Sequence, residues 1–413
     1  MSNKKNNTLK LTPIILIAFC MFLYTPILKH APVISYAIQY GIPIAFILTN
    51  IKCIKTLPLK TLILLAACGL MFTMSLIIPV LFNTNDFSYL ANTTYVFRKA
   101  PIYLFLIIII IRKYGRNSIV EHFLYHYSMA TVVYILFTII LIATPQIKTI
   151  WFNIFSMTNG TEELLTNYGY TFRIGWLGFS GFRFTMYCTF SCIFLLYLRY
   201  SSGKYLTAKQ FIIPYLICIL GNMFYGRVGI IATFATSVLM MVMTDKLKIK
   251  NILILSLVAA ALLFSLYTLR NLPIISDWYN WMTTPIVNLF TKGDFDNYSF
   301  DRMNSMLFMP EPETLIHGDG YYVYEGHYYK KTDLGIMRNV LYWGIPGAIL
   351  SYGTTLYGLM DAKRKSRALL IAIIIAFAIF EYKGDTYYEI IAFIAPMTAF
   401  LNIKHNMLET QYD

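Results

Sequence analysis

The sequence predicts an all-α membrane protein built as a bundle of about twelve transmembrane helices. Of its 413 residues, 57% are hydrophobic and only 13% are charged, about half the charged fraction of a typical soluble domain. The mean hydropathy is +0.58. Apolar runs long enough to cross the hydrocarbon core, about 20 residues each, follow one another along the chain. These observations exclude a soluble enzyme, a disordered tail protein and a disulfide scaffold.

The apolar runs define the order of the predicted spans. They lie near 11–28, 31–50, 61–82, 96–111, 120–143, 182–199, 210–225, 227–244, 251–269, 335–360, 368–382 and 386–403. The run near 96–111 is short and carries Arg98 and Lys99 at its entrance.

Two long polar segments, 145–181 and 271–336, interrupt these runs. We therefore divide the chain into three parts. Residues 1–270 hold nine predicted spans and the first long loop, 271–336 form a large outer loop, and 337–413 hold the last spans and a tail.

Charge sets the predicted orientation. With the N-terminus in the cytoplasm, 20 of the 34 Lys and Arg residues but only 5 of the 20 acidic residues fall inside. Because clustered Lys and Arg in short loops stay on the cytoplasmic side, both termini are predicted inside and both long loops outside. The first span lacks a cleavage site and is predicted to be a signal anchor. The net charge of +14 then reflects anchoring to anionic lipid rather than nucleic-acid binding.

Arginine is enriched on the predicted outer side, which holds seven Arg and seven Lys against five Arg and fifteen Lys inside. Topology requires no cations there, and the planar guanidinium grips a phosphate with two parallel hydrogen bonds. A pyrophosphate headgroup is the ligand that this set predicts. The alternative is that each Arg snorkels or pairs with an outer acid such as Asp385 or Glu389. The seven are Arg98, Arg173, Arg183, Arg227, Arg270, Arg302 and Arg338.

The large outer loop carries most of the remaining signals. Residues 299–309 have apolar side chains at helical spacing and could lie on the membrane surface, and the composition of 316–320 predicts a sharp turn. The segment 321–333 is rich in tyrosine, whose apolar face and polar tip suit sugar rings; an interfacial aromatic belt is the alternative. The predicted sugar contacts are Tyr321, Tyr322, Tyr324 and Tyr328. The candidate general bases are Asp333, His327, His317 and Glu325.

These residues form a pattern: Arg302, then His317-Gly-Asp-Gly320, then Thr332-Asp333 and, in the following span, Arg338 and Gly344-Ile-Pro-Gly347. The pattern resembles the large-loop region of Wzy-type polymerases of O-antigen and capsular repeat units. The Gly226-Arg227 span start resembles a Ser-Arg position of that family, with Gly in place of Ser. The resemblance covers the topology of the whole chain and motifs over roughly 226–350.

The resemblance implies a metal-independent membrane glycosyltransferase of GT-C-like fold, without a cofactor, in the bacterial cytoplasmic (inner) membrane. Its substrates would be undecaprenyl-pyrophosphate-linked glycans at the outer face, and a chain-length regulator is a candidate partner. A departing pyrophosphate needs preorganised cations, and the acceptor hydroxyl needs a base. For the base we rank Asp333 and His327 before His317 and Glu325. For the pyrophosphate we rank Arg227, Arg173 and Arg302 first, followed by Arg98, Arg183 and Arg338.

Two other functions stay open. An O-antigen ligase shares the architecture, uses lipid A-core as acceptor and has an outer-loop His, a position that His317 could fill. A flippase or other transporter of the lipid-linked repeat also fits twelve spans. Transporters, however, place ionisable residues near the membrane midplane, whereas here they cluster at the outer edge.

Overall fold

The computed structural model describes residues 8–53, 58–157, 173–179, 181–200, 205–244, 305–360 and 367–401, with scattered residues between 267 and 291. This part of the chain is mostly helical, with two short β-hairpins. The helices are α1 (Pro13–Leu23), α2 (Pro32–Tyr36), α3 (Ile42–Thr49), α4 (Leu59–Leu81), α5 (Leu90–Tyr114), α6 (Ile119–Ala143), α7 (Pro145–Ile154), α9 (Phe182–Tyr200), α10 (Ala208–Tyr225), α11 (Arg227–Met243), α15 (Pro312–His317), α16 (Gly335–Leu359), α17 (Arg367–Glu381) and α18 (Tyr387–Leu401).

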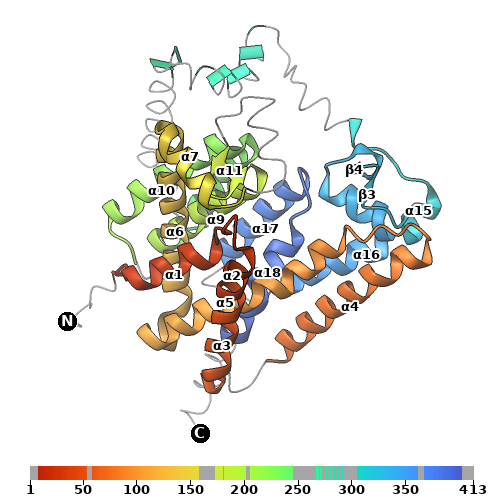
Figure 1. Cartoon of the computed structure of the whole chain (residues 1–413), viewed down its shortest axis with the longest axis horizontal. Helices are drawn as coiled ribbons and strands as arrows, with labels where there is room; N and C mark the ends of the chain where they lie inside the picture. Colours follow the sequence, from red (N-terminus) through yellow and green to blue (C-terminus); the bar gives the residue numbers. More distant parts are fainter. Residues whose placement is uncertain are drawn as a thin grey trace.

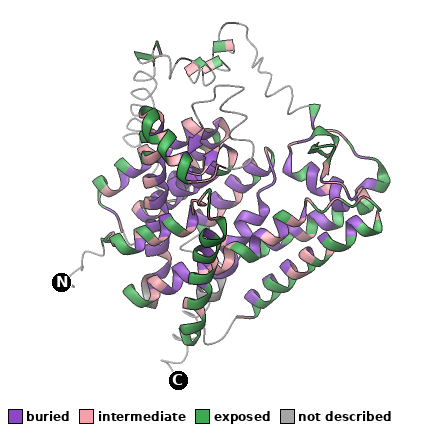
Figure 2. Cartoon of the chain, viewed as in Figure 1, coloured by how far each residue is buried: buried purple, intermediate pink, exposed green. Residues whose placement is uncertain are grey.

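The architecture is that of an all-α membrane protein. Within the described residues, five helices are long and apolar enough to cross a membrane: Pro32–Thr49, which joins α2 to α3, and α4, α5, α6 and α10. Their outer faces carry large apolar side chains, such as Leu48 at 63% and Leu59 at 73% exposure. Figure 2 shows the exposed residues on the outer faces of α2, α3 and α4 and the buried ones in the centre. Lipid would cover such faces.

Each predicted run within the described residues overlaps a helix, whereas the run near 251–269 lies almost wholly outside them. The run near 96–111 belongs to a longer helix, because α5 begins at Leu90. Arg98 and Lys99 therefore lie inside α5 rather than at its entrance. The amphipathic stretch 299–309 falls largely outside the described residues.

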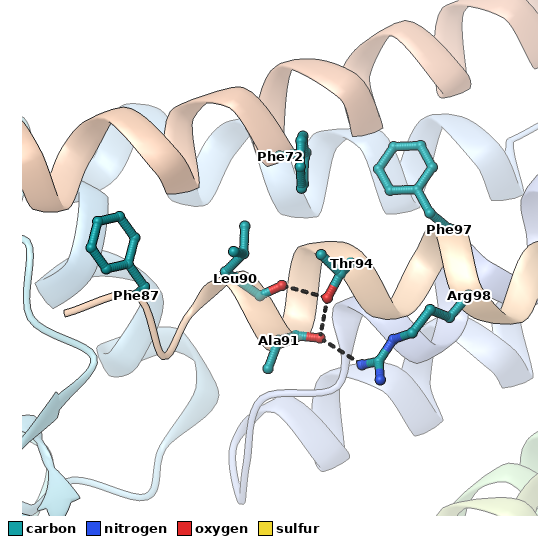
Figure 3. Close-up of a pocket in the computed structure, with 7 residues that line it drawn as sticks. All are labelled: Phe72, Phe87, Leu90, Ala91, Thr94, Phe97 and Arg98. Atoms are coloured by element: carbon teal, nitrogen blue, oxygen red, sulfur yellow. Dashed lines mark hydrogen bonds between the residues drawn. The ribbon is translucent and has the colours of Figure 1, made fainter. Parts of the chain in front are cut away.

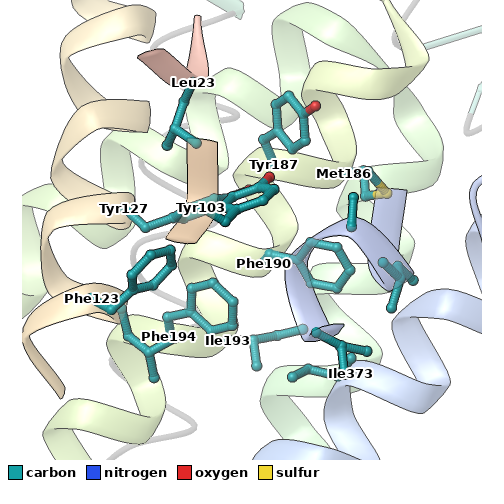
Figure 4. Packing of buried hydrophobic residues seen from close by; sticks show 14 of the residues in the cluster. Leu23, Tyr103, Phe123, Tyr127, Met186, Tyr187, Phe190, Ile193, Phe194 and Ile373 are labelled. Atoms are coloured by element: carbon teal, nitrogen blue, oxygen red, sulfur yellow. The ribbon is translucent and has the colours of Figure 1, made fainter. Parts of the chain in front are cut away.

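The bundle core is formed by helices from both ends of the sequence. α9 packs against α6, α10, α11 and α17, and α5 packs against α18. Figure 4 shows the aromatic interior where they meet. There Phe194 lies 5.4 Å from Tyr127 and 5.9 Å from Phe393 between ring centroids. The C-terminal helices α17 and α18 thus share one hydrophobic core with α5, α6 and α9.

Polar side chains also join helices inside the bundle. The Thr185 hydroxyl of α9 donates to Asn222 Oδ1 of α10 at 2.9 Å, and Asn222 Nδ2 donates to Thr233 Oγ1 of α11 at 2.8 Å. A Cβ at Gly229 would lie 2.2 Å from Asn222 Oδ1. Gly229 thus permits α9, α10 and α11 to approach closely. Small residues commonly play this role between membrane helices.

A second region is an arm formed by α4 and α16, which pack against each other and carry α15 and the β3–β4 hairpin at one end. α16 is broken at Trp343 and Gly344, whose φ of 71° is left-handed. The break frees two carbonyl groups, and the loop after α15 satisfies them. Asp319 N–H donates to Leu341 O at 2.7 Å, and Gly320 N–H donates to Tyr342 O at 3.1 Å. Of the turn predicted at 316–320, residues 318–320 form it, with φ of 77° at Gly318 and 69° at Gly320, whereas Ile316 and His317 end α15.

The two hairpins are short. β1 (Ile174–Gly175) pairs with β2 (Gly178–Phe179), and β3 (Val323–Tyr324) pairs with β4 (His327–Tyr328), both antiparallel. The first hairpin lies on α6, since a Cβ at Gly175 would meet Tyr134 Oη at 2.0 Å. The second hairpin lies at the end of the arm, on the connection between α4 and α5.

Candidate functional site

The β3–β4 hairpin turns through Glu325 and Gly326, both with positive φ, 49° and 79°. Two positive φ values in a two-residue loop match the right-handed twist of a hairpin. Its register pairs Val323 with Tyr328 and Tyr324 with His327. The tyrosine-rich segment thus folds into a compact projection at the end of the arm.

Asp86, in the connection between α4 and α5, anchors this hairpin. Its Oδ2 accepts hydrogen bonds from the N–H groups of Tyr322 at 2.6 Å and Val323 at 2.7 Å. Nearby, Thr84 Oγ1 donates to Gly320 O at 2.9 Å. Because hydrogen bonds to an ionised group are short and strong, these contacts fix the hairpin on the bundle.

Arg338, in the first turns of α16, lies beneath the hairpin. Its guanidinium carbon lies 4.1 Å from the ring centroid of Tyr322 and 3.6 Å from that of Tyr328. The two rings stand at 64° to each other and form a corner that holds the cation. Only 8% of Arg338 is exposed, so the stacking, a form of cation–π contact, fixes the direction of its donors.

Asp385, between α17 and α18, joins the hairpin to three helices. Its Oδ2 accepts from Asn92 Nδ2 at 2.9 Å and from Tyr322 Oη at 3.1 Å, and its Oδ1 accepts from Asn339 Nδ2 at 3.3 Å. Burial raises the pKa of Asp385 to about 6, whereas the Arg338 guanidinium lowers it. The carboxyl group can therefore change its charge near neutral pH while its hydrogen-bond partners hold it in place.

Glu389, one turn further along α18, holds a second arginine. Its Oε1 lies 2.6 Å from Arg183 Nε, and its Oε2 accepts from Tyr95 Oη at 2.5 Å and Tyr187 Oη at 3.0 Å. The Glu389 side chain is 2% exposed, whereas the Arg183 side chain is 50% exposed. Arg183 is thus held from below by a buried acid while half of its surface stays open. The pairing of an arginine with Glu389, which was the alternative to phosphate binding for this residue, is observed for Arg183.

Glu381, at the end of α17, braces the same connection. Its Oε1 accepts from Thr386 N–H at 2.6 Å and from Thr386 Oγ1 at 2.7 Å, and its Oε2 accepts from Tyr352 Oη at 2.9 Å. A buried carboxyl group with three hydrogen-bond donors around it is well compensated. The loop that carries Asp385 is therefore held at both ends.

Arg98 reaches the same neighbourhood from α5. Its guanidinium carbon lies 5.9 Å from the Tyr95 ring centroid, and that of Arg183 lies 5.3 Å from the same ring. Arg98 also ends an open, mainly apolar groove of about 910 Å³ between α4 and α5. Figure 3 shows its lining, with Arg98 Nη2 donating to Ala91 O at 3.3 Å. The lining residues are Phe72, Phe87, Leu90, Ala91, Thr94, Phe97 and Arg98.

The predicted phosphate-binding arginines are thus distributed unevenly. Arg98 and Arg183 both lie near Tyr95, and Arg183 and Arg338 both interact with Tyr388, so these three share one neighbourhood, although we ranked them behind Arg227, Arg173 and Arg302. Arg227 begins α11 and Arg173 precedes β1 with a φ of 68°. Both are half-buried. Arg302 lies outside the described residues.

The four candidate bases also occupy different environments. Glu325 and His327 are exposed on the hairpin, and Asp333 is half-buried just before α16. His317 packs against Phe82 with ring centroids 5.2 Å apart, and its Nδ1 lies 2.7 Å from Gly318 O. Since a carbonyl only accepts, Nδ1 donates this hydrogen bond, and in a neutral ring Nε2 then presents the lone pair. Within the described residues, no group of three or more His, Cys, Asp or Glu is arranged to hold a metal ion.

The hairpin tyrosines fall into two groups. Tyr322 and Tyr328 hold Arg338, and Tyr322 is only 6% exposed. Tyr321 and Tyr324 pack instead with Tyr329, which sequence had not singled out. The four predicted sugar contacts are therefore divided between a cation corner and a separate aromatic cluster.

Sequence reasoning missed several residues of this site. Asp86 lies in the connection between α4 and α5, whereas Asn92, Asn339 and Glu381 lie inside helices of the bundle, where a polar side chain is costly unless it has partners. That cost was the available signal: each such residue needed a buried partner, but the partners lie up to 293 positions away in sequence, as for Asn92 and Asp385. Only the fold could identify them.

Together these contacts form one polar end of the bundle. It offers three arginines that could bind a polyanion and the buried Asp385, whose pKa is about 6. The exposed hairpin adds the candidate bases Glu325 and His327. Comparison with protein-family models gives no match, and comparison with curated proteins gives none either.

Proposed function

We propose that this chain is a membrane glycosyltransferase of the Wzy type. It would polymerise undecaprenyl-pyrophosphate-linked oligosaccharide repeats into O-antigen or capsular polysaccharide at the outer face of the bacterial cytoplasmic membrane. About twelve spans in a GT-C-like bundle, with both termini in the cytoplasm, belong to this proposal. The observation that carries it is Arg338, stacked on Tyr322 and Tyr328 where the hairpin meets the arginine-rich end of the bundle.

The chemistry needs few groups. The acceptor hydroxyl attacks the anomeric carbon of the donor, the bond to the pyrophosphate oxygen breaks, and the lipid pyrophosphate leaves with the electron pair. The acceptor proton passes to a base. Among the candidates we favour Asp333, because it lies two residues before α16 begins and five residues before Arg338, which the first turns of that helix carry. This short connection to a rigid helix limits how far the base and the cation can move apart.

The arginines would stabilise the departing pyrophosphate. Arg338 is oriented by aromatic stacking and Arg183 by Glu389, so neither needs to reorganise when negative charge develops. Arg98, at the end of the apolar groove, would hold the phosphate of a lipid whose chain lies along Phe72 and Phe97. Membrane lipid and the lipid-linked glycan are thus the proposed partners.

An O-antigen ligase is the second candidate, and one observation favours it. His317 Nε2 is left as an acceptor by the hydrogen bond of Nδ1, so it could deprotonate an acceptor sugar on lipid A-core. A transporter of the lipid-linked repeat is the third.

Deleting the gene and running the surface polysaccharide on a gel separates these functions. A ladder that collapses to a single repeat on the acceptor supports the polymerase. Polymer that persists on its lipid carrier without reaching lipid A-core would replace the polymerase with the ligase. Repeats trapped facing the cytoplasm would identify a transporter.

A further inference from the structure

The outer surface of the hairpin carries an aromatic cluster that the proposed bond-forming step does not use. It consists of Tyr321, Tyr324 and Tyr329, which we call the tyrosine platform. Tyr321 stacks on Tyr329 with ring centroids 5.2 Å apart and an interplanar angle of 26°. Tyr324 stands at 85° to Tyr321, 5.4 Å away, and is 49% exposed.

Charged groups border this platform. Lys330 Nζ lies 3.5 Å from Asp319 Oδ2 and 5.5 Å from the Tyr329 ring centroid. Burial and the nearby Asp319 carboxylate raise the pKa of Tyr329 to about 12, so its hydroxyl stays protonated and donates to Asp319, while its oxygen can still accept. The surface therefore combines two ring orientations with donors and acceptors at its edge.

We propose that the tyrosine platform is a binding site for a carbohydrate segment, separate from the Arg338 corner. Sugar rings present C–H faces and hydroxyl edges, and rings at right angles can contact both the face of one sugar and the side of the next. The polar border matches the hydroxyl groups. The inference rests on the proposed function: the platform would hold the growing glycan at a distance from its reacting end.

The position of the hairpin supports a holding role. Asp86 and Arg338 fix the hairpin from below through Tyr322, Val323 and Tyr328. Tyr324 is left exposed on this rigid support, and Tyr321 and Tyr329 are half-buried beside it. Preordered aromatic side chains bind with little loss of conformational freedom. A glycan held there would stay close to the enzyme between successive transfers.

A binding experiment tests the site directly. The full-length protein in detergent is titrated with surface polysaccharide of the same bacterium, released by mild acid and separated into short and long pools. Wild type should bind the long pool, and Tyr324→Ala and Tyr321→Ala should weaken binding about tenfold, because each removes one ring contact. Tyr324→Phe should bind like wild type. Unchanged binding in both alanine variants would overturn the proposal.

A matched control separates aromatic loss in general from this site. Tyr36 on α2 is also exposed and stacks on Tyr40 at 6.4 Å, so Tyr36→Ala should leave glycan binding unchanged.

A membrane test distinguishes the platform from an aromatic belt at the membrane interface. Because the chain has five native tryptophans, Tyr324→Trp is compared with wild type in vesicles with brominated phosphatidylcholine. The added tryptophan should show no quenching beyond that of wild type; strong additional quenching would place the platform in lipid and overturn the carbohydrate assignment.

The surface polysaccharide gives a functional result. In cells carrying Tyr324→Ala, the ladder should shift to shorter chains while repeat addition continues. A wild-type protein that binds no polysaccharide would defeat the inference even if it polymerises. Normal ladders after gene deletion would defeat the proposed function, and glycan binding lost in Tyr324→Ala would still support the platform.

Discussion

The buried end of the bundle and the exposed hairpin use the same kinds of residues differently. In the bundle, Glu389 accepts from two tyrosines and pairs with Arg183, and it is 4% exposed. At the hairpin tip, Glu325 is exposed at a turn with a φ of 49°. A buried charge needs several partners to offset desolvation, whereas an exposed one is solvated. The residue type alone therefore says little about the role of a glutamate here. The residues that contact it decide that role.

The sharpest way to test this difference is to remove the stacked arginine. Arg338→Ala should lower polymerisation about 100- to 1,000-fold, the usual effect of losing one preorganised electrostatic group. Arg338→Lys should rescue little, because an ammonium cannot stack flat on Tyr328. Polymer length on a gel, normalised to protein in the membrane, measures both variants. Normal ladders in Arg338→Ala would show that Arg338 and the Tyr322–Tyr328 corner take no part in polymerisation.

The buried acid should matter for stability as well. Breaking a buried ion pair costs about 3–5 kcal/mol, and because half of Arg183 is exposed we expect Glu389→Ala to cost about 3 kcal/mol. Thermal unfolding in detergent should show a lower Tm. Glu121 accepts one hydrogen bond from Tyr205 at 3.1 Å and is half-buried. Glu121→Gln is therefore the control, with an expected loss under about 1 kcal/mol. Equal losses would erase the distinction.

Asp385 predicts a pH dependence that links the two regions. Its pKa is raised to about 6, so the carboxylate that faces Arg338 becomes protonated as pH falls through 6. Activity should fall about tenfold between pH 7 and pH 5, following the ionised fraction. The folded state binds this proton more tightly than the unfolded state. The contribution of Asp385 to the free energy of unfolding therefore rises as the pH falls from 7 to 5.

Assays between pH 8 and pH 5 should therefore show activity falling as the pH is lowered, while Tm does not fall on account of this group. Asp385→Asn should remove the inflection near pH 6. An unchanged profile in this variant would assign the titration to another group.

The smallest expected effect is at the hairpin tip. Glu325→Gln should change the rate by less than about twofold, since substitutions of exposed residues are usually mild. Asp333→Asn, closer to Arg338 in the chain, should lower the rate about 100-fold if Asp333 is the base. Repeat incorporation into membranes measures both. A larger loss of rate in Glu325→Gln than in Asp333→Asn would identify Glu325, at the hairpin tip, as the base instead.

Helix positions could be predicted because each span must satisfy its own backbone hydrogen bonds within lipid. Apolar length therefore located α4, α6 and α10 closely. The turn at Gly318 and Gly320 was also predictable, because Gly tolerates positive φ. The β3–β4 hairpin was not predicted, since a tyrosine-rich segment could equally lie at the membrane interface.

The sequence by itself determined that this is a helical membrane protein with an excess of arginine on one predicted side. Only the tertiary structure decided which arginines work together. Arg183 meets Glu389 across 206 positions, and Tyr322 meets Asp385 across 63. Hydropathy is a local property that each segment expresses alone. The pairing of buried charges depends on which helix ends meet, and the packing of α9, α16 and α18 sets that.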